Sequence, residues 1–116
     1  MRDATPKAIG ARLQEIALAK TTISYGRLIG ELGLPELDGP WPSHPLARIF
    51  EVLDQEDADA GRPFRTSVVV SQKTNEPGGG FFEALGRLKG TRVTKQQQTS
   101  IWISELNAAH DYPWGG

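Results

Sequence analysis

The stretch from Thr22 to Pro35 constrains the fold of this chain more than any other. Two β-branched residues lead into the polar sequence Ser24-Tyr25-Gly26, in which Ser24 is a favourable helix N-cap. Apolar residues then recur at helical spacing, at Leu28, Ile29 and Leu32. The sequence Gly33-Leu34-Pro35 ends the pattern, as glycine and proline do after a helix. A short helix bounded in this way is typical of the second helix of a helix-turn-helix or winged-helix unit, which predicts a surface for reading nucleic acid.

Two more helices are predicted on either side of this one. The first runs from about Thr5 to Lys20 and has apolar residues at Ile9, Leu13 and Ile16. The other is expected to be capped by Ser43, and its apolar stripe lies at Leu46, Ile49, Phe50 and Leu53. Because that stripe faces the core, we expect the acidic run from Asp54 to Asp59 to lie mostly in solvent.

The second half of the chain is predicted to mix a strand, a turn and two helices. Residues 64–71 form the best strand candidate, because Val68-Val69-Val70 is a short buried run. The glycine-rich segment 73–80 is expected to be a wing-like turn that needs positive φ angles. Helices are expected over residues 81–88 and 99–109, the latter packing on the core through Ile101, Trp102, Leu106 and Ala109. The predicted fold is mainly α with a small β element, a single winged-helix-like domain over residues 1–116 that ends in a C-terminal helix and a short Pro/Trp tail.

Composition excludes several classes of chemistry. The chain of 116 residues has no cysteine, which excludes disulfides, zinc–thiolate sites and thiol nucleophiles. The N-terminal residues lack the apolar core of a signal peptide, and no window approaches a membrane span. We therefore expect a cytoplasmic protein with no membrane partner. The net charge is −1, whereas dedicated DNA-binding proteins usually carry a basic excess.

The order helix, short helix, helix, strand and Gly-rich turn resembles the DNA-binding domain of O6-alkylguanine-DNA alkyltransferases and their catalytically inactive alkyltransferase-like relatives. The resemblance covers roughly residues 9–82. The sequence Ile23-Ser24-Tyr25-Gly26-Arg27-Leu28 is similar to the family segment (V/T)-(S/T)-Y-G-x-(I/L), and Gly33-Leu34-Pro35 is similar to its G-x-P. Leu46-Ala47-Arg48 falls where the family has the A-R-A-V start of its recognition helix, whose arginine replaces a flipped base. The resemblance implies that Arg48 is this finger and that Tyr25 is a phosphate-side contact.

The chain departs from this family at the reactive motif. Where the family has P-C-H-R-V-V, the sequence reads Arg65-Thr66-Ser67-Val68-Val69-Val70. Alkyl transfer is therefore excluded, because attack by a thiolate is the whole reaction. The two histidines, His44 and His110, are far apart in sequence, and no acid–histidine spacing suggests a metal site. We predict a protein that is not an enzyme and needs no metal or cofactor.

Two functions remain open at this stage. The first is a winged-helix protein that binds double-stranded DNA, including damaged or distorted duplex. Its candidate contacts are Tyr25, Arg27, Arg48, Lys73, Lys89 and Arg92. The other is a protein–protein interaction module without DNA binding, such as a phage, immunity or defence-system accessory, for which the acidic run and the aromatic residues would serve as anchors. Those residues are Trp41, Phe81, Phe82, Trp102 and Trp114, of which Trp114 is expected to be the most exposed, whereas Trp41 and Trp102 can equally close the small core.

For Tyr25 and Arg48, a structural role is as compatible with the sequence as a role in DNA binding. Tyr25 can equally be a packed ring with its hydroxyl in water. Arg48 can equally be a surface residue, or one that is ion-paired with Glu51 or Glu31. The sequence does not specify an oligomeric state.

Overall fold

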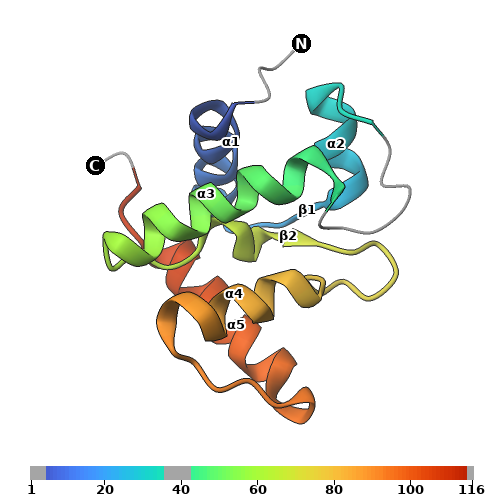
Figure 1. Ribbon diagram of the computed structural model, residues 1–116. Coiled ribbons are helices and arrows are strands. Elements are labelled where there is room, and N and C mark those ends of the chain that lie inside the picture. Colours follow the sequence, from blue (N-terminus) through green and yellow to red (C-terminus); the bar gives the residue numbers. More distant parts are fainter. Residues whose placement is uncertain (1–4, 36–42, 115–116) are drawn as a thin grey trace.

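The computed structural model describes residues 5–35 and 43–114, and within them the fold is mainly helical with a small two-stranded parallel sheet (Figure 1). The elements in chain order are α1 (Pro6–Leu18), β1 (Ile23–Ser24), α2 (Tyr25–Leu32), α3 (Pro45–Asp59), the 3-10 helix η2 (Arg65–Val68), β2 (Val69–Val70), α4 (Gly79–Lys89), the 3-10 helix η3 (Lys95–Gln97) and α5 (Gln98–Asp111). The radius of gyration is 13.1 Å, which is that of one compact domain of about this length. Within the described ranges, no helix combines the length and the apolar character that crossing a membrane requires.

The predicted ends of α2 are confirmed. The Ser24 hydroxyl accepts a hydrogen bond from the backbone N–H of Arg27 at 3.1 Å, which satisfies one of the free donors in the first turn. Gly33 follows the helix with a φ of 65°, a left-handed conformation that favours glycine. The helix buries Leu28, Ile29 and Leu32, so the spacing read from the sequence does face the core.

The cap of α3 differs from the prediction, because His44 caps the helix in place of Ser43. The Nδ1 atom of His44 accepts a hydrogen bond from the backbone N–H of Leu46 at 3.1 Å. The opposite ring nitrogen, Nε2, therefore carries the proton and donates to the carbonyl oxygen of Pro35 at 2.7 Å. One imidazole thus caps α3 and joins it to the segment that follows α2, whereas Ser43 is exposed.

The predicted strand over residues 64–71 is wrong in extent. Only Val69 and Val70 are extended, and they pair in parallel with Ile23 and Ser24. The preceding residues form η2, because local polar contacts compete with a ladder there. The Ser67 hydroxyl donates to the Phe64 carbonyl at 2.7 Å, and the backbone N–H of Arg65 donates to the carboxylate of Asp57 at 2.9 Å.

The glycine-rich turn is also corrected in detail. Residues 71–78 do form a turn, closed by a hydrogen bond from Ser71 N to the Glu76 carbonyl at 2.8 Å. Its positive φ angle belongs to Asn75, at 57°, and not to the glycines. Gly79 and Gly80 instead begin α4. The helices predicted over residues 81–88 and 99–109 are confirmed as α4 and α5, each extended by a few residues.

Two apolar clusters hold the fold together. The larger one joins α1, α2, α3 and β2, and the smaller one lies under α4 and α5 around Phe64, Phe81 and Trp102. Trp114 was expected to be exposed, but it is only 6% exposed and belongs to the larger cluster. Its indole N–H donates to the Ala109 carbonyl at 2.7 Å, so the chain after α5 folds back onto that helix. Trp41 lies outside the described residues.

Candidate nucleic-acid interface

A cleft of about 500 Å³ lies between α3 and α4, which run side by side in Figure 1. Its volume is within the range of small-molecule sites, roughly 300–1,000 Å³. One wall is built by α3, which contributes residues at helical spacing, Ala47, Phe50, Glu51 and Asp54. The other wall comes from α4 between Gly79 and Arg87, while Tyr25 and Thr66 complete the lining. The sequence identified Tyr25 but did not predict this cleft.

Tyr25, the first residue of α2, connects that helix to the cleft. Its phenol oxygen accepts a hydrogen bond from the backbone N–H of Gly78 at 3.0 Å, at the start of α4. Its ring lies 6.3 Å from the ring of Phe50 between centroids, with the planes tilted by 38°. Burial is the main cause that raises the pKa of the Tyr25 hydroxyl, so the phenol is neutral at physiological pH. Tyr25 is therefore a packed residue of the cleft lining, and its hydroxyl is hydrogen-bonded to the protein backbone.

Asp54 and Thr66 form the polar floor of the cleft. The Thr66 hydroxyl donates to Asp54 Oδ1 at 2.7 Å, and the two residues are only 3% and 4% exposed, respectively. Burial raises the pKa of Asp54 to about 7. The hydroxyl of Thr66 and the positive charges of Arg87 and Arg65 oppose this shift, while the negative charge of Asp57 adds to it. Asp54 therefore changes its charge near neutral pH.

The acidic end of α3 is not the solvated run that the sequence predicted. Asp57 is completely buried, and its Oδ1 accepts hydrogen bonds from the Nε atoms of Arg62 and Arg65, each at 3.1 Å. Asp54 and Asp57 each follow a buried apolar residue of the stripe by four positions, and residues four apart share one face of a helix. That spacing was the signal for their burial. The other acids of this stretch, Glu51, Glu56 and Asp59, are exposed as expected.

The rim of the cleft is charged. Arg87 Nε and Glu83 Oε1 form an exposed ion pair at 3.1 Å on α4. Arg48 is exposed and lies one turn before Glu51 on α3, which places it beside this rim. The ion pairs that the sequence suggested for Arg48, with Glu51 or Glu31, do not form among the described residues. Glu31 instead pairs with Arg12 at 2.9 Å.

The other predicted DNA contacts divide into two groups. Arg27, whose side chain is 77% exposed, lies two residues after Tyr25, and Lys73 is exposed in the turn that ends at Gly78. These two residues and Arg48 therefore lie on the elements that meet at Tyr25.

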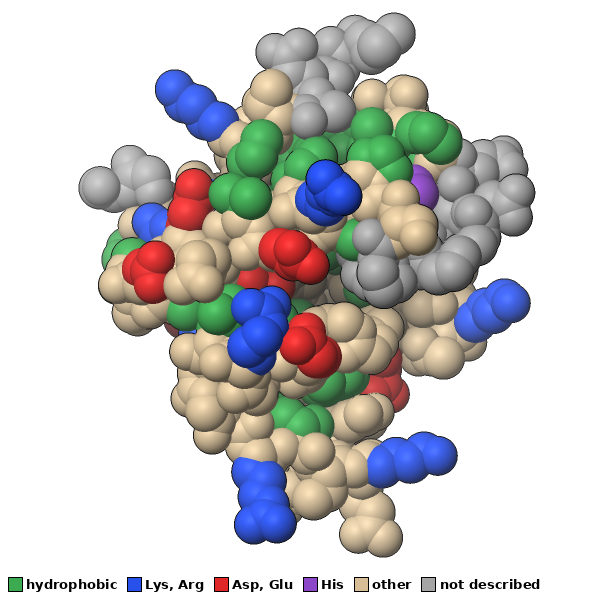
Figure 2. All heavy atoms as spheres, viewed as in Figure 1, with side chains coloured by type: hydrophobic (Ala, Val, Ile, Leu, Met, Phe, Trp, Pro, Cys, Tyr) green, Lys and Arg blue, Asp and Glu red, His purple; other side chains and the backbone are tan. Residues whose placement is uncertain are grey.

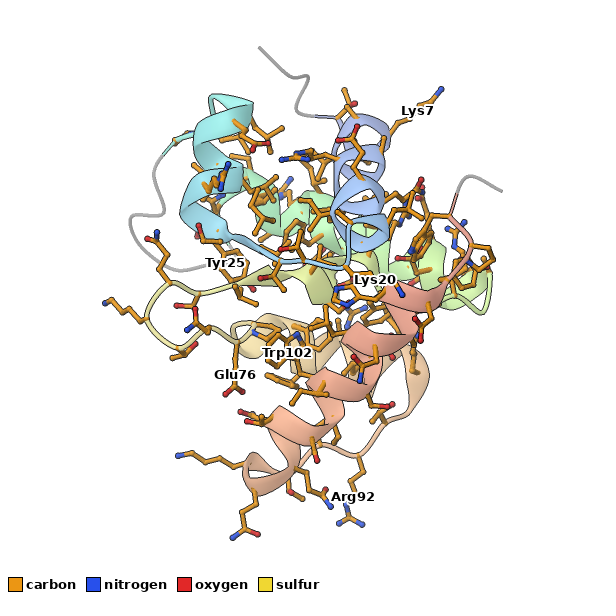
Figure 3. All side chains as sticks on the ribbon, turned by 180° about the vertical axis from the view of Figure 1, so that it is seen from behind. Lys7, Lys20, Tyr25, Glu76, Arg92 and Trp102 are labelled. Atoms are coloured by element: carbon orange, nitrogen blue, oxygen red, sulfur yellow. The ribbon has the colours of Figure 1, made fainter. Side chains whose placement is uncertain are left out.

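Lys89 and Arg92 do not join them. The ammonium group of Lys89 donates to the Arg62 carbonyl and to the Glu105 carboxylate, both at 2.8 Å, so it is committed to holding α4 and α5 together. Arg92 is exposed, but Figure 3 shows it at the far end of the molecule from Tyr25.

Charge is mixed on the face that carries α3 and α4. In Figure 2, acidic and basic side chains alternate over the middle of this face, and the remaining basic side chains stand apart at its edges. Among the side chains coloured there, no continuous basic strip forms. Sequence-independent binding to duplex DNA depends on clustered cations that contact phosphates. From the mixed charge of this face we therefore expect such binding to be weak.

The described residues contain no group of three or more acidic or histidine side chains placed to hold a metal ion. Comparisons with family models, curated proteins and solved structures found no match. Function must therefore be inferred from the cleft, its walls and its charges.

Proposed function

We propose that this protein is a non-enzymatic DNA-binding protein that binds distorted or damaged duplex and accepts an extruded nucleobase in the cleft between α3 and α4. The observation that carries the proposal is the cleft, which has the volume of a small-molecule site, aromatic walls and a polar floor, beside the exposed Arg48. Proteins that read an extruded base stack it against apolar side chains and hydrogen-bond its edge. In this proposal α2 and α3 are the helix-turn-helix part of a winged-helix-like scaffold.

The phosphate contacts in this proposal are few. Arg27, Arg48 and Lys73 are exposed on elements that meet at Tyr25 and can reach the backbone on either side of an extruded nucleotide. Three phosphate contacts give a slope of log K against log salt of roughly −3. Affinity for undamaged duplex is therefore expected to be low, in keeping with the net charge of −1. The base in the cleft supplies the additional free energy that selects a distorted site.

Thr66 has a binding role in this proposal and not a chemical one. It stands where the resembled family has its reactive cysteine, and it lines the cleft. A hydroxyl is a weak nucleophile unless a strong base takes its proton. Asp54, whose pKa is about 7, is too weak a base to deprotonate an alcohol to a useful extent. The pair is instead suited to donate and accept hydrogen bonds at the edge of a base.

The alternative, a protein–protein interaction module, has lost part of its support. Trp114, the anchor expected to be the most exposed, is buried in the larger cluster, and Trp102 lies in the smaller cluster, as its predicted packing on the core requires. The exposed acids of α3 remain, but they are scattered along the helix. The cleft is the more specific feature, and it favours the DNA-binding function.

Binding of labelled duplexes tests this proposal. A duplex with 2-aminopurine at a mismatched position reports both binding, by anisotropy, and base extrusion, by a rise in 2-aminopurine fluorescence. We expect tighter binding than to a matched duplex. Arg48→Ala should weaken binding by at least about tenfold, the scale of one lost phosphate or base contact. The matched control Arg92→Ala removes an exposed arginine far from the cleft and should change binding by less than about twofold.

A variant of the cleft itself completes the test. Gly79 lines the cleft, and a Cβ atom added there meets no atom within 4 Å, so Gly79→Ala should add a methyl group to the lining without a clash and reduce the preference for the mismatched duplex. Absence of binding at low salt to matched, mismatched and alkylated duplexes would refute the proposed function.

A further inference from the structure

Building on the proposed function, we propose that the cleft selects a flat ligand with a positive charge, and that in DNA this ligand is an N-alkylated, cationic nucleobase. Alkylation of a ring nitrogen such as N3 of cytosine leaves a cation, whereas alkylation of an exocyclic oxygen such as O6 of guanine leaves a neutral base. The two lesion classes therefore differ in charge, and the lining of the cleft distinguishes them.

The charges that line the cleft are mainly negative. The acids are Glu51, Asp54 and Glu83, and the basic residue that lines it is Arg87. The guanidinium of Arg87 is taken up by Glu83 at 3.1 Å. Glu51 forms no ion pair with any described residue and faces the ligand from the rim. The lining thus holds three acids and one arginine, and a cation that enters the cleft meets a net negative charge when Asp54 is ionised.

The buried carboxylate of Asp54 points to a ligand most directly. Its Oδ1 is held by Thr66, but the structure gives Oδ2 no hydrogen bond from the described residues. Within the same residues, every fully buried side-chain nitrogen or oxygen has a partner. Oδ2 must therefore reach accessible space, and the cleft is the space that Asp54 lines. The Asp54 carboxylate is only 4% exposed and its Oδ2 lacks a partner among the described residues, so a ligand with a hydrogen-bond donor or a positive charge would stabilise it.

The walls suit a flat cation as well. The aromatic residues Tyr25, Phe50 and Phe81 line the cleft, and cations are attracted to the faces of aromatic rings. The N–H of Gly78, at the positive end of α4, is already taken up by the Tyr25 hydroxyl. That donor is therefore not presented to the ligand, where it would favour an anion or a carbonyl oxygen.

A neutral base with an O6-alkyl group fits this lining poorly. Its N7 and alkylated O6 are acceptors, which Asp54 and Glu51 would repel, and its exocyclic amino group can donate to a carboxylate but brings no positive charge. A cationic base such as 3-methylcytosine brings its charge and its exocyclic amino donor to the same carboxylates. The lining thus predicts a target class different from the one after which the resembled family is named.

Two methylated cytosines that differ in charge test this inference. 3-Methylcytosine is protonated and therefore a cation at neutral pH, whereas 5-methylcytosine carries its methyl group on a neutral base. Each is placed unpaired at the same position of a labelled duplex, and the free nucleosides are titrated separately. We expect the 3-methylcytosine duplex to bind at least about tenfold more tightly, the scale of one desolvated cation–π or charge contact. Asp54→Asn should reduce this ratio to below about threefold. Asp59→Asn, the same charge change at an exposed site of α3, should leave it unchanged.

The outcomes separate this inference from the proposed function. If both unpaired duplexes bind more tightly than the matched duplex but with equal affinity, an extruded base is read and the inference of charge selection is overturned. If no duplex binds, the proposed function fails, and the titrations with free nucleosides then test whether the cleft selects a cation. Preferential binding of free 3-methylcytidine that Asp54→Asn abolishes would support charge selection without DNA. Equal binding of the two nucleosides, or none, would overturn it.

Discussion

Replacing Asp54 with asparagine should stabilise the protein above neutral pH. Burial raises the pKa of this carboxyl from an ordinary value of 3.8 to about 7. Between these two values the folded state binds a proton that the unfolded state has released, so stability falls as the pH rises through this window. Above the folded pKa the loss is complete, because the protein then carries a buried negative charge. Asparagine carries no charge and keeps an oxygen that can accept the hydrogen bond of Thr66.

The magnitude follows from the size of the shift. Each pH unit inside the window costs about 1.4 kcal/mol for a single group. From about pH 5 to about pH 8, the folded pKa near 7 gives a loss of about 2 to 3 kcal/mol in the free energy of unfolding. Asp54 is only 4% exposed, so screening by solvent removes little of this cost. Water that enters the cleft would reduce it, which makes this figure an upper value.

Urea unfolding followed by tryptophan fluorescence measures this effect, since Trp102 and Trp114 are both buried. The informative quantity is the difference in free energy between Asp54→Asn and wild type at each pH, in which the titrations of all other groups largely cancel. This difference should grow in favour of the variant from about pH 5 to about pH 8. Asp59→Asn is the control, because Asp59 is exposed on the same helix and, within residues 5–35 and 43–114, its carboxylate accepts a hydrogen bond from the side chain of Gln55 alone. A difference that stays constant with pH would refute the burial argument.

Other substitutions should affect stability in opposite directions. Gly10→Ala should destabilise by about 1 to 3 kcal/mol, because the new Cβ would lie 2.5 Å from Nη1 of the ion-paired Arg65. A Cβ atom added at Gly30 meets no atom within 4 Å, so Gly30→Ala should stabilise α2 by about 0.5 to 1 kcal/mol. If urea unfolding shows that both substitutions change the free energy of unfolding in the same direction, this argument is contradicted. Asp57→Asn should cost about 3 to 5 kcal/mol, because it removes the buried carboxylate that compensates Arg65 and leaves only the exposed Glu56 as its ion-pair partner. A loss below about 1 kcal/mol would show that the pair is not structurally important.

The helices could be predicted from the sequence because their signals are local. Ser24 and Gly33 bound α2 by short-range hydrogen bonds and a left-handed φ, neither of which needs the rest of the fold. The same holds for the apolar spacing of α1 and α3. Local propensity favours Ser43 over His44 as the cap of α3. The structure places His44 there because its ring also bonds the carbonyl of Pro35, nine residues earlier, a contact that the local sequence does not reveal.

The floor of the cleft could not be predicted because its partners come from different elements. Thr66 lies twelve residues after Asp54, in a segment whose valines indicate a strand. The strand prediction failed there because side-chain bonds of η2 replace a ladder. The wall formed by α4 was not expected near Tyr25 either, since the bond between Tyr25 and Gly78 joins residues 53 positions apart. The charge pattern along α3 therefore predicted which acids of the helix are exposed, but it did not predict the acid that is buried on the side facing α4.

Two aspartates three residues apart on α3 show how a binding group can be told from a structural one. Asp57 is buried, and both of its oxygens are bonded to arginine side chains or to backbone N–H, so its charge is compensated within the fold. Asp54 is buried to a similar degree, but among the described residues it receives one hydrogen bond, from the Thr66 hydroxyl, and it lines the cleft. An apolar residue in its place would avoid the cost of a buried charge. The presence of Asp54 in the cleft, despite its cost to stability, is explained if a bound ligand supplies the positive charge or hydrogen-bond donor that the fold does not.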